Sequence, residues 1–126
     1  MFSKGYKNDA GYDILLDIPI VFQPFVTTVI DLGIKYTPKK GYMGFLCSRT
    51  SAASKGLIVA QCPIDTDYSG TIHAIVHNLS SKIIQYDAGE AFCQLVIVPI
   101  KYDKRIKCKI KKLGRRSTGK FGSTNK

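Results

Sequence analysis

The sequence predicts a single all-β domain with a jelly-roll-like arrangement of strands. Short apolar or alternating segments follow one another between turn residues, which is typical of antiparallel sandwiches and barrels. No window keeps the 3.6-residue period of an amphipathic helix. The length of 126 residues suits one domain with a single core. We expect a β domain over residues 1–113 and a flexible C-terminal arm over residues 114–126.

Eight segments are predicted as strands because apolar and β-branched residues dominate them and turn residues bound them. In order, they are residues 12–16, 25–36, 42–47, 57–60, 71–78, 83–86, 92–100 and 105–113. Gly33 is expected to mark a bulge or bend within the second segment. The small polar residues 48–55 allow at most a short helical turn. The last segment alternates Ile106, Cys108 and Ile110 with lysines, which favours an edge strand.

The net charge of +10 is concentrated in the last fifth of the chain. Residues 1–100 carry eight basic and eight acidic side chains, whereas residues 101–126 carry eleven basic side chains and one acid, Asp103. A basic tail favours polyanionic partners, either the phosphates of a nucleotide or nucleic acid. A tail that only improves solubility would have the same charge pattern, so charge alone leaves these alternatives open.

The cysteines and histidines do not form a metal-binding pattern. The four cysteines lack CxxC spacing, and three of them lie in apolar or alternating stretches, where we expect buried and reduced thiols. His73 and His77 fall in a predicted strand, which separates them by about 13 Å and argues against a shared metal. We therefore expect neither histidine to be a ligand.

The most informative stretch is residues 64–70, Ile-Asp-Thr-Asp-Tyr-Ser-Gly. It lies between the apolar residues 57–60 and the alternating residues 71–78, so it is predicted to form the bend of a hairpin. Carboxylates and a phenol on a loop held by a rigid sheet can converge on a ligand. An ordinary solvated turn would have the same composition. Residues 64–70 alone therefore do not distinguish a ligand-binding loop from such a turn, and further motifs are needed.

A pattern near the C-terminus resembles a phosphate-binding loop but is misleading. Gly114, Gly119 and Lys120 match a P-loop up to its last position, where Phe121 replaces Ser or Thr. A true P-loop opens a helix whose N-terminus binds phosphate. Since only six residues follow Lys120, we do not expect a P-loop NTPase.

Five patches, in order along the chain, resemble the motifs of the trimeric dUTP nucleotidohydrolases (dUTPases), a family with phage and viral members. They are residues 10–14 (AGYDI), 48–57 (SRTSAASKGL), 64–70 (IDTDYSG), 89–95 (GEAFCQL) and 116–124 (RSTGKFGST). Each patch alone is weak, but all five stand in the family's order at fitting distances. The resemblance implies a jelly-roll fold, hydrolysis of dUTP to dUMP and pyrophosphate, Mg²⁺ as cofactor, and a homotrimer with shared active sites.

The resemblance also implies a role for individual residues. Asp65 would be the base that activates the attacking water, Asp13 would help to hold Mg²⁺ through water, and Tyr68 would lie against the deoxyribose. The remaining substrate-binding residues would be Arg49, Thr50, Ser51, Gln94, Arg116, Phe121, Gly122, Ser123 and Thr124. Attack on the α-phosphorus needs a positioned water, a base and cations that absorb developing charge, and these residue types supply them.

Some positions depart from the family's pattern. The stretch from Leu57 to Asp65 is shorter than is usual in the family. In the family the backbone of this hairpin contacts uracil, so the departure bears on base selectivity. Ala91 replaces a frequent arginine, and Ser117 and Lys120 replace glycines of the arm. A side chain at Lys120 would either stiffen the arm or add a phosphate contact.

Three other functions compete with dUTP hydrolysis. The related dCTP deaminases use a glutamate on the strand after the third motif, whereas residues 71–78 contain no carboxylate. A non-catalytic regulator that binds a protein partner would not need all of Asp13, Asp65, Tyr68, Gln94 and Phe121. A nucleic-acid binder working through residues 101–126 would have few aromatic platforms for bases. We therefore expect an enzyme without a nucleic-acid partner.

No apolar run reaches the length of a membrane span, and the first residues lack the apolar region of a signal peptide. We therefore expect no membrane partner. The expected location is the cytoplasm, or the interior of the host cell for a viral protein.

Overall fold

The computed structural model describes residues 1–110, and within them it contains ten strands and one short helix. The elements are β1 (Phe2–Ser3), β2 (Gly11–Ile14), β3 (Ile20–Phe22), β4 (Thr27–Asp31), β5 (Tyr42–Ser48), α1 (Thr50–Ser54), β6 (Leu57–Val59), β7 (Pro63–Ile64), β8 (His73–Asn78), β9 (Ile84–Tyr86) and β10 (Cys93–Pro99). The prediction of an all-β fold is confirmed. The expected arm lies outside the described residues, and with it Arg116, Phe121, Gly122, Ser123 and Thr124.

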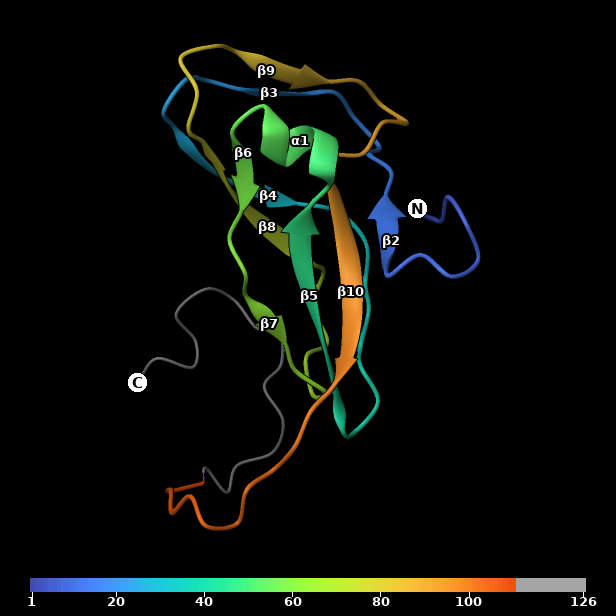
Figure 1. The fold of residues 1–126 in the computed structure, drawn as a ribbon, viewed down its shortest axis with the longest axis vertical. Coiled ribbons are helices and arrows are strands. Elements are labelled where there is room, and N and C mark those ends of the chain that lie inside the picture. Colours follow the sequence, from blue (N-terminus) through green and yellow to red (C-terminus); the bar gives the residue numbers. More distant parts are fainter. Residues whose placement is uncertain (111–126) are drawn as a thin grey trace.

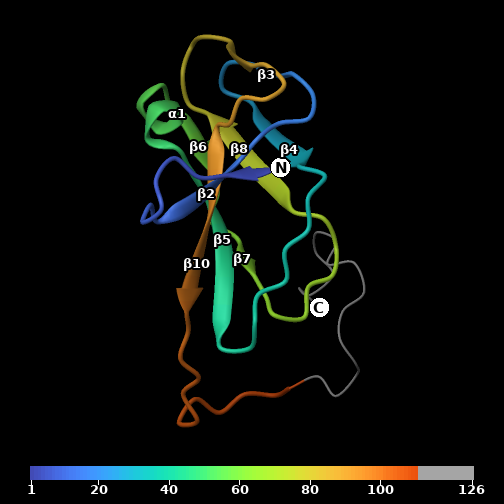
Figure 2. The same ribbon diagram turned by 90° about the vertical axis from the view of Figure 1, so that its right-hand side faces the viewer.

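Two layers of sheet form the body (Figures 1 and 2). The larger sheet has the strand order β1-β2-β10-β5-β7, and the smaller one has the order β4-β8-β6. In Figure 2, β5 and β10 stand on one side of the body and β4 and β8 on the other. The pair β3–β9 closes one end, and α1 lies beside β6 just below that pair in Figure 1. This is the jelly-roll-like arrangement that the sequence predicts.

The core lies between the layers, and strand periodicity decides which side chains enter it. On β8, Ala74 and Val76 are buried, whereas the alternate residues are only half-buried. Leu46 of β5 and Leu95 of β10 are buried in the opposite layer. At the end closed by β3 and β9, three rings pack edge-on or tilted: Phe22, Tyr86 and Phe92, with centroids 5.2 to 6.5 Å apart. Such burial of large apolar side chains is the main favourable contribution to folding.

The expected strands are present, with shorter bounds in most cases, but the last one is wrong over residues 105–110. These residues form no strand, and the side chains of Ile106 and Ile110 are 69% and 80% exposed. The stretch begins in a turn instead: Arg105 donates to Asp103 Oδ1 from its backbone nitrogen (2.9 Å) and from Nε (3.0 Å). Alternation alone does not make a strand, because a strand also needs a neighbouring edge to pair with.

Two smaller expectations have different outcomes. The bend at Gly33 is confirmed, because its φ is +67° and its N–H donates to Asp31 Oδ1 at 2.8 Å. The expectation of three buried cysteines is wrong, since Cys93 is buried, Cys47 is half-buried, and Cys62 and Cys108 are exposed. All four are free thiols. No helix within residues 1–110 has both the length and the apolar character needed to cross a membrane.

Candidate active site

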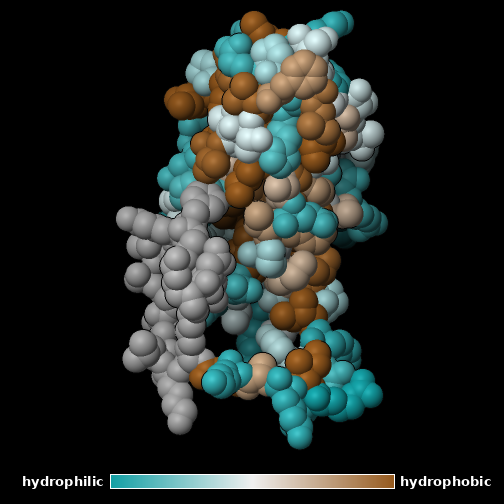
Figure 3. All heavy atoms as spheres, turned by 90° about the vertical axis from the view of Figure 1, so that its left-hand side faces the viewer, coloured by the Kyte–Doolittle hydropathy of each residue, from teal (hydrophilic) through white to brown (hydrophobic). Residues whose placement is uncertain are grey.

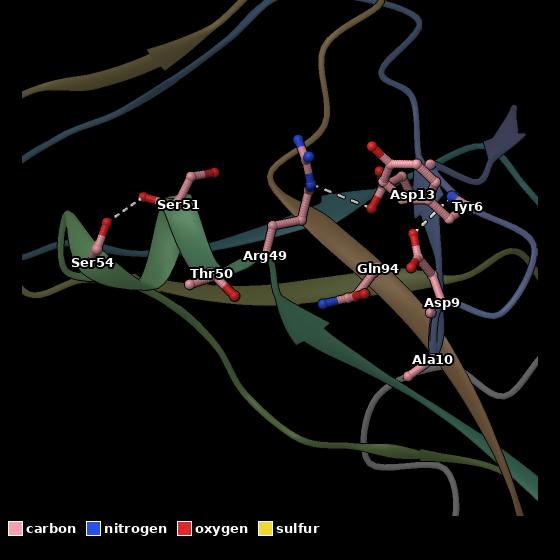
Figure 4. Close-up of a pocket in the computed structure, with 11 residues that line it drawn as sticks. Tyr6, Asp9, Ala10, Asp13, Arg49, Thr50, Ser51, Ser54 and Gln94 are labelled. Atoms are coloured by element: carbon pink, nitrogen blue, oxygen red, sulfur yellow. Dashed lines mark hydrogen bonds and ion pairs between the residues drawn. The ribbon is translucent and has the colours of Figure 1, made fainter.

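A pocket of about 680 Å³ opens where β2, β10 and the start of α1 meet (Figure 4). Its lining residues are Gly5, Tyr6, Asp9, Ala10, Gly11, Asp13, Arg49, Thr50, Ser51, Ser54 and Gln94. They include every residue that the first, second and fourth motifs were expected to contribute. Three segments that are far apart in sequence therefore share one cavity.

Sheet register explains why these segments meet. Strand β10 lies between β2 and β5, so that Gln94 stands opposite Asp13 on one side and opposite Cys47 on the other. Just beyond the end of β5, the Arg49 N–H donates to the Phe92 carbonyl at 2.9 Å, which extends the ladder to the residue that precedes α1. The Ser48 hydroxyl donates to the Leu57 carbonyl and accepts from the Val59 N–H, both at 2.9 Å. These bonds tie both ends of α1 to the sheets and fix the pocket wall.

Arg49 is the cation of the pocket, and two partners orient its guanidinium. Its Nε lies 3.3 Å from Asp13 Oδ1, and its Nη1 donates to the Ala91 carbonyl at 3.2 Å. The side chains are 41% and 24% exposed, so this ion pair contributes at most about 1 kcal/mol to stability. Its main consequence is geometric. A guanidinium has five N–H donors, so the fork can still bind an anion in the pocket.

Gln94 owes its place to a glycine. A Cβ on Gly11 would lie 2.8 Å from Gln94 Cδ and would overlap Oε1. A side chain at position 11 would therefore displace the Gln94 amide from its present orientation, in which Nε2 reaches the Ser48 carbonyl at 3.4 Å. Burial raises the pKa of the neighbouring Cys47 thiol, and a contact with Gln94 partly opposes that rise. The thiol therefore stays neutral beside the pocket.

The outer wall of the pocket was missed by the sequence analysis. It consists of a loop in which Tyr6 N–H donates to Asp9 Oδ2 at 2.8 Å and Asp9 N–H donates to the Tyr6 carbonyl at 3.1 Å. The signal available was the turn-forming pair Asn8 and Asp9 in front of the Asp13 strand. That signal predicts a turn, but it does not show which cavity the turn would border.

Asp65 and Tyr68 do not line the pocket. The predicted hairpin is confirmed, because β6 and β8 pair antiparallel with Val59 opposite Val76. Within its long tip, β7 pairs with β5, placing Ile64 opposite Gly44. Gly44 lies four residues before Ser48, which is about 13 Å along the strand. The hairpin tip, defined here as residues 60–72, therefore pairs with the larger sheet at a point well away from the pocket (below it in Figure 1).

Hydrogen bonds to a neighbouring segment hold the hairpin tip in place. The hydroxyl of Thr37 donates to the Tyr68 carbonyl at 2.9 Å, and that of Thr66 donates to the Pro38 carbonyl at 2.8 Å. The Tyr68 phenol donates to the Thr71 carbonyl. Burial, and to a lesser extent the Asp31 carboxylate, raises the pKa of this phenol. Tyr68 is thus a protonated donor on a fixed backbone.

The pocket wall carries two carboxylates of the kind that Mg²⁺ binds. Among residues 1–110, no group of three or more His, Cys, Asp or Glu side chains could hold a metal. Asp9 and Asp13 nevertheless bring two carboxylates to the pocket wall. One or two carboxylates, completed by phosphate oxygens and water, are the usual protein contribution to an Mg²⁺ site. The donor set therefore fits Mg²⁺ bound to a nucleotide.

Comparisons with known proteins agree with this geometry. Residues 1–125 match the dUTPase family model. The chain is 34% identical over 119 residues to a deoxyuridine 5'-triphosphate nucleotidohydrolase of Hydrogenobaculum sp., covering 91% of this chain and 83% of that protein. It is 26% identical to the Pol polyprotein of caprine arthritis encephalitis virus, of whose length it spans 11%.

Among solved structures, a mutant dUTPase from phage phi11 of S. aureus, which coordinates a structural Mg(II) ion, has a TM-score of 0.75 and 25% identity. The match covers 90% of this chain and 92% of that one. A family model that spans nearly the whole chain, a bacterial relative of similar length and a shared fold lead to one conclusion: the chain belongs to the dUTPase family.

Proposed function

We propose that the protein is a dUTP diphosphatase that hydrolyses dUTP to dUMP and pyrophosphate. The observation that carries this proposal is the meeting of Asp13, Arg49 and Gln94 in one pocket of a chain that belongs to the dUTPase family. A relative that is 34% identical over most of both chains is named for the same reaction. The proposed location is the cytoplasm, or the host-cell interior if the protein is viral.

The pocket would bind the triphosphate. The planar guanidinium of Arg49 can donate two parallel hydrogen bonds to phosphate oxygens, which a lysine ammonium cannot do. The hydroxyls of Thr50 and Ser51 and the Gln94 amide line the same cavity and can donate hydrogen bonds to the remaining oxygens. Asp65 would accept a proton from the water that attacks the α-phosphorus, and Tyr68 would lie against the deoxyribose. Cationic and N–H donors placed at the phosphates stabilise the charge that develops during attack.

Mg²⁺ would be held by the phosphates and, through water, by Asp13. When bound, it neutralises phosphate charge and orients the triphosphate. The contribution of the chain is to keep the Asp13 carboxylate at the pocket wall, where the Arg49 Nε at 3.3 Å fixes its direction.

The separation of Asp65 from the pocket supports a homotrimer with shared sites. Because the hairpin tip lies away from the pocket of its own chain, we infer that it completes the pocket of a neighbouring copy, with residues 114–126 contributing from another. The outer face of the smaller sheet offers apolar contact area: Val29 is 54% exposed, and Ile58 and Ile75 are half-buried. Seen from the left-hand side of Figure 1, the body also carries apolar side chains among polar ones (Figure 3). Cyclic closure would bury such faces equally in every copy.

One assay tests the proposed activity. Purified protein with Mg²⁺ would be offered dUTP, dCTP, dTTP and UTP separately, and pyrophosphate release would be measured. We expect turnover of dUTP far above that of the other three nucleotides. Arg49→Ala serves as the control for contaminating hydrolases. Release of ammonia from dCTP, or no turnover of any nucleotide, would overturn the proposal.

A further inference from the structure

One backbone carbonyl joins the hairpin tip to strand β8. The Tyr68 phenol donates to the carbonyl oxygen of Thr71, and Nδ1 of His73 lies 3.1 Å from the same oxygen. A carbonyl oxygen can only accept, so Nδ1 of His73 must carry a proton. The Thr71 carbonyl thus receives two donors, one from the side chain proposed to contact the sugar and one from a strand outside the pocket.

The other nitrogen of His73 faces a carboxylate. Its Nε2 lies 3.6 Å from Asp31 Oδ2, and the register of β4 with β8 places Asp31 directly opposite His73. Asp31 is itself held, because its Oδ1 accepts from the Gly33 N–H at 2.8 Å. The pKa of Asp31 is lowered first by that N–H and then by a hydrogen bond from the Thr71 side chain, with a smaller contribution from His73. The carboxylate is therefore ionised and faces the ring of His73.

These contacts form a chain from Asp31 through His73 and the Thr71 carbonyl to the Tyr68 ring. The Tyr68 backbone has separate anchors, since its carbonyl accepts from Thr37 and its N–H donates to the Asp65 carbonyl at 3.1 Å. The direction of the ring depends on a different bond, the one from its phenol to Thr71. Loss of His73 would remove the second donor to the Thr71 carbonyl, so that the carbonyl and the phenol bound to it could shift while the backbone anchors of Tyr68 stay in place.

We propose that His73 and Asp31 are positioning residues that hold the Tyr68 ring through the Thr71 carbonyl and so set the preference for deoxyribose over ribose. This inference rests on the proposed function, because Tyr68 discriminates between sugars only if dUTP is the substrate. Neither residue touches substrate. Their effect passes through the orientation of an aromatic ring, and a small tilt of that ring changes the space left for a 2'-hydroxyl.

The same strand supplies a matched control. His77 lies on the same face of β8, four residues further along, and is half-buried like His73. Its Nδ1 is 2.8 Å from the Thr27 hydroxyl, at the end of the β4–β8 ladder away from the hairpin tip. His77→Ala therefore removes an equal volume and an equal kind of ring from the same sheet face without touching the Thr71 carbonyl.

The kinetic test compares kcat/KM for dUTP and UTP. In His73→Ala, the dUTP/UTP ratio should fall about three- to tenfold, the factor expected when one hydrogen bond is lost. Asp31→Asn should lower the ratio in the same direction, and His77→Ala should leave it within about twofold, because it breaks no bond to the tip. His73→Asn keeps an N–H donor at the position of Nδ1 and should restore most of the ratio. An unchanged ratio in His73→Ala, or an equal fall in His77→Ala, would overturn the inference.

A measurement independent of turnover uses the NMR signals of the imidazole nitrogens in the wild-type protein. We expect a proton on Nδ1 of His73, and we expect its signals to shift in Tyr68→Phe, because the Thr71 carbonyl then loses one of its donors. The signals of His77 should not shift. A bare Nδ1 or unchanged His73 signals would refute the contact even if dUTP is not hydrolysed. Inactive wild-type protein with the expected signals would instead refute the proposed function and leave the contact standing.

Discussion

The pocket and the hairpin tip are both expected to serve one reaction, yet they are built in different ways. The pocket collects side chains from three segments because β10 lies between β2 and β5. The hairpin tip comes from one continuous segment, and it reaches the larger sheet at Gly44, below the pocket. A single chain thus holds its proposed phosphate-binding side chains in one place and its proposed base in another.

The two regions also differ in how firmly they are held. In the pocket, Arg49 and Asp13 form an ion pair that is partly exposed, so water can compete for both partners. In the hairpin tip, side-chain hydroxyls bind backbone carbonyls at Tyr68 and Pro38, which fixes the main chain itself. We therefore expect changes in the pocket to weaken nucleotide binding and changes in the tip to alter chemistry or selectivity. The predictions below test this division, starting from the largest expected effect.

Asp65→Asn should lower kcat by about 10² or more, which is the scale for loss of a general base. Binding of a non-hydrolysable dUTP analogue should stay within a few-fold of wild type, because the pocket is intact. Steady-state kinetics and calorimetric titration measure the two quantities. Asp67→Asn, in the same tip, is the matched control and should retain most activity. Turnover of Asp65→Asn within a few-fold of wild type would place the base elsewhere.

Mixing two inactive variants tests whether pocket and tip come from different chains. Asp65→Asn lacks the proposed base, and Arg49→Ala lacks the pocket cation. If they are coexpressed equally and assemble at random, about one site in four should combine an intact pocket with an intact tip. Activity should then rise to about a quarter of the wild-type value, the same one-in-four fraction. No recovery from verified mixed oligomers would mean that each site is made within one chain.

Gly11→Ala should raise KM for dUTP by about tenfold, which corresponds to about 1.4 kcal/mol of lost binding. The added Cβ would overlap Oε1 of Gln94 and push its amide away from the pocket. Gln94→Ala removes the clash, so the double variant should be no worse than Gln94→Ala alone. Full additivity of the two KM effects would show that Gly11 acts through some other contact. kcat should change little in either case.

Tyr68→Ala should lower the ratio of kcat/KM for dUTP to that for UTP by several-fold or more, because the ring is the proposed barrier to a 2'-hydroxyl. The measurement is the ratio of kcat/KM for the two nucleotides. Tyr42→Ala offers a control with an exposed ring on β5, outside both regions, and should leave the ratio unchanged. A constant ratio in Tyr68→Ala would remove Tyr68 from sugar selection and confine the tip to catalysis.

The smallest expected effect is a change in the rate of thiol labelling, which is measured without any substitution that alters activity. Burial raises the pKa of Cys93 to about 12, so at pH 8 almost none of it is the reactive thiolate. Cys62, next to β7 in the hairpin tip, is exposed and should label quickly in the separated chain. If the tip enters a neighbouring pocket, assembly with nucleotide should slow labelling of Cys62 and leave exposed Cys108 unchanged. Mass spectrometry resolves the two sites.

The sequence by itself determined the fold class and most of the strands. Alternation of apolar residues along 71–78 fixes which side of β8 enters the core, because successive side chains of a strand point to opposite faces. The hairpin around Asp65 also follows from local residues, since turn formers separate two strand patterns. Strands β1, β3 and β7, of two or three residues each, are not predicted by the sequence, because segments this short carry little periodicity. Strands β6 and β9 are equally short and are predicted only as parts of four-residue segments bounded by turn residues.

Only the tertiary structure decided how the site is divided. The meeting of Asp13, Arg49 and Gln94 depends on which strands pair, and pairing between distant segments leaves no local mark in the sequence. The distance of Asp65 from that pocket depends on β7 joining β5 near Gly44. Likewise, alternation in residues 105–110 predicts a strand, but no neighbouring edge pairs with it within the described chain. Local pattern sets the conformation that a segment prefers, whereas contacts distant in sequence decide what it meets.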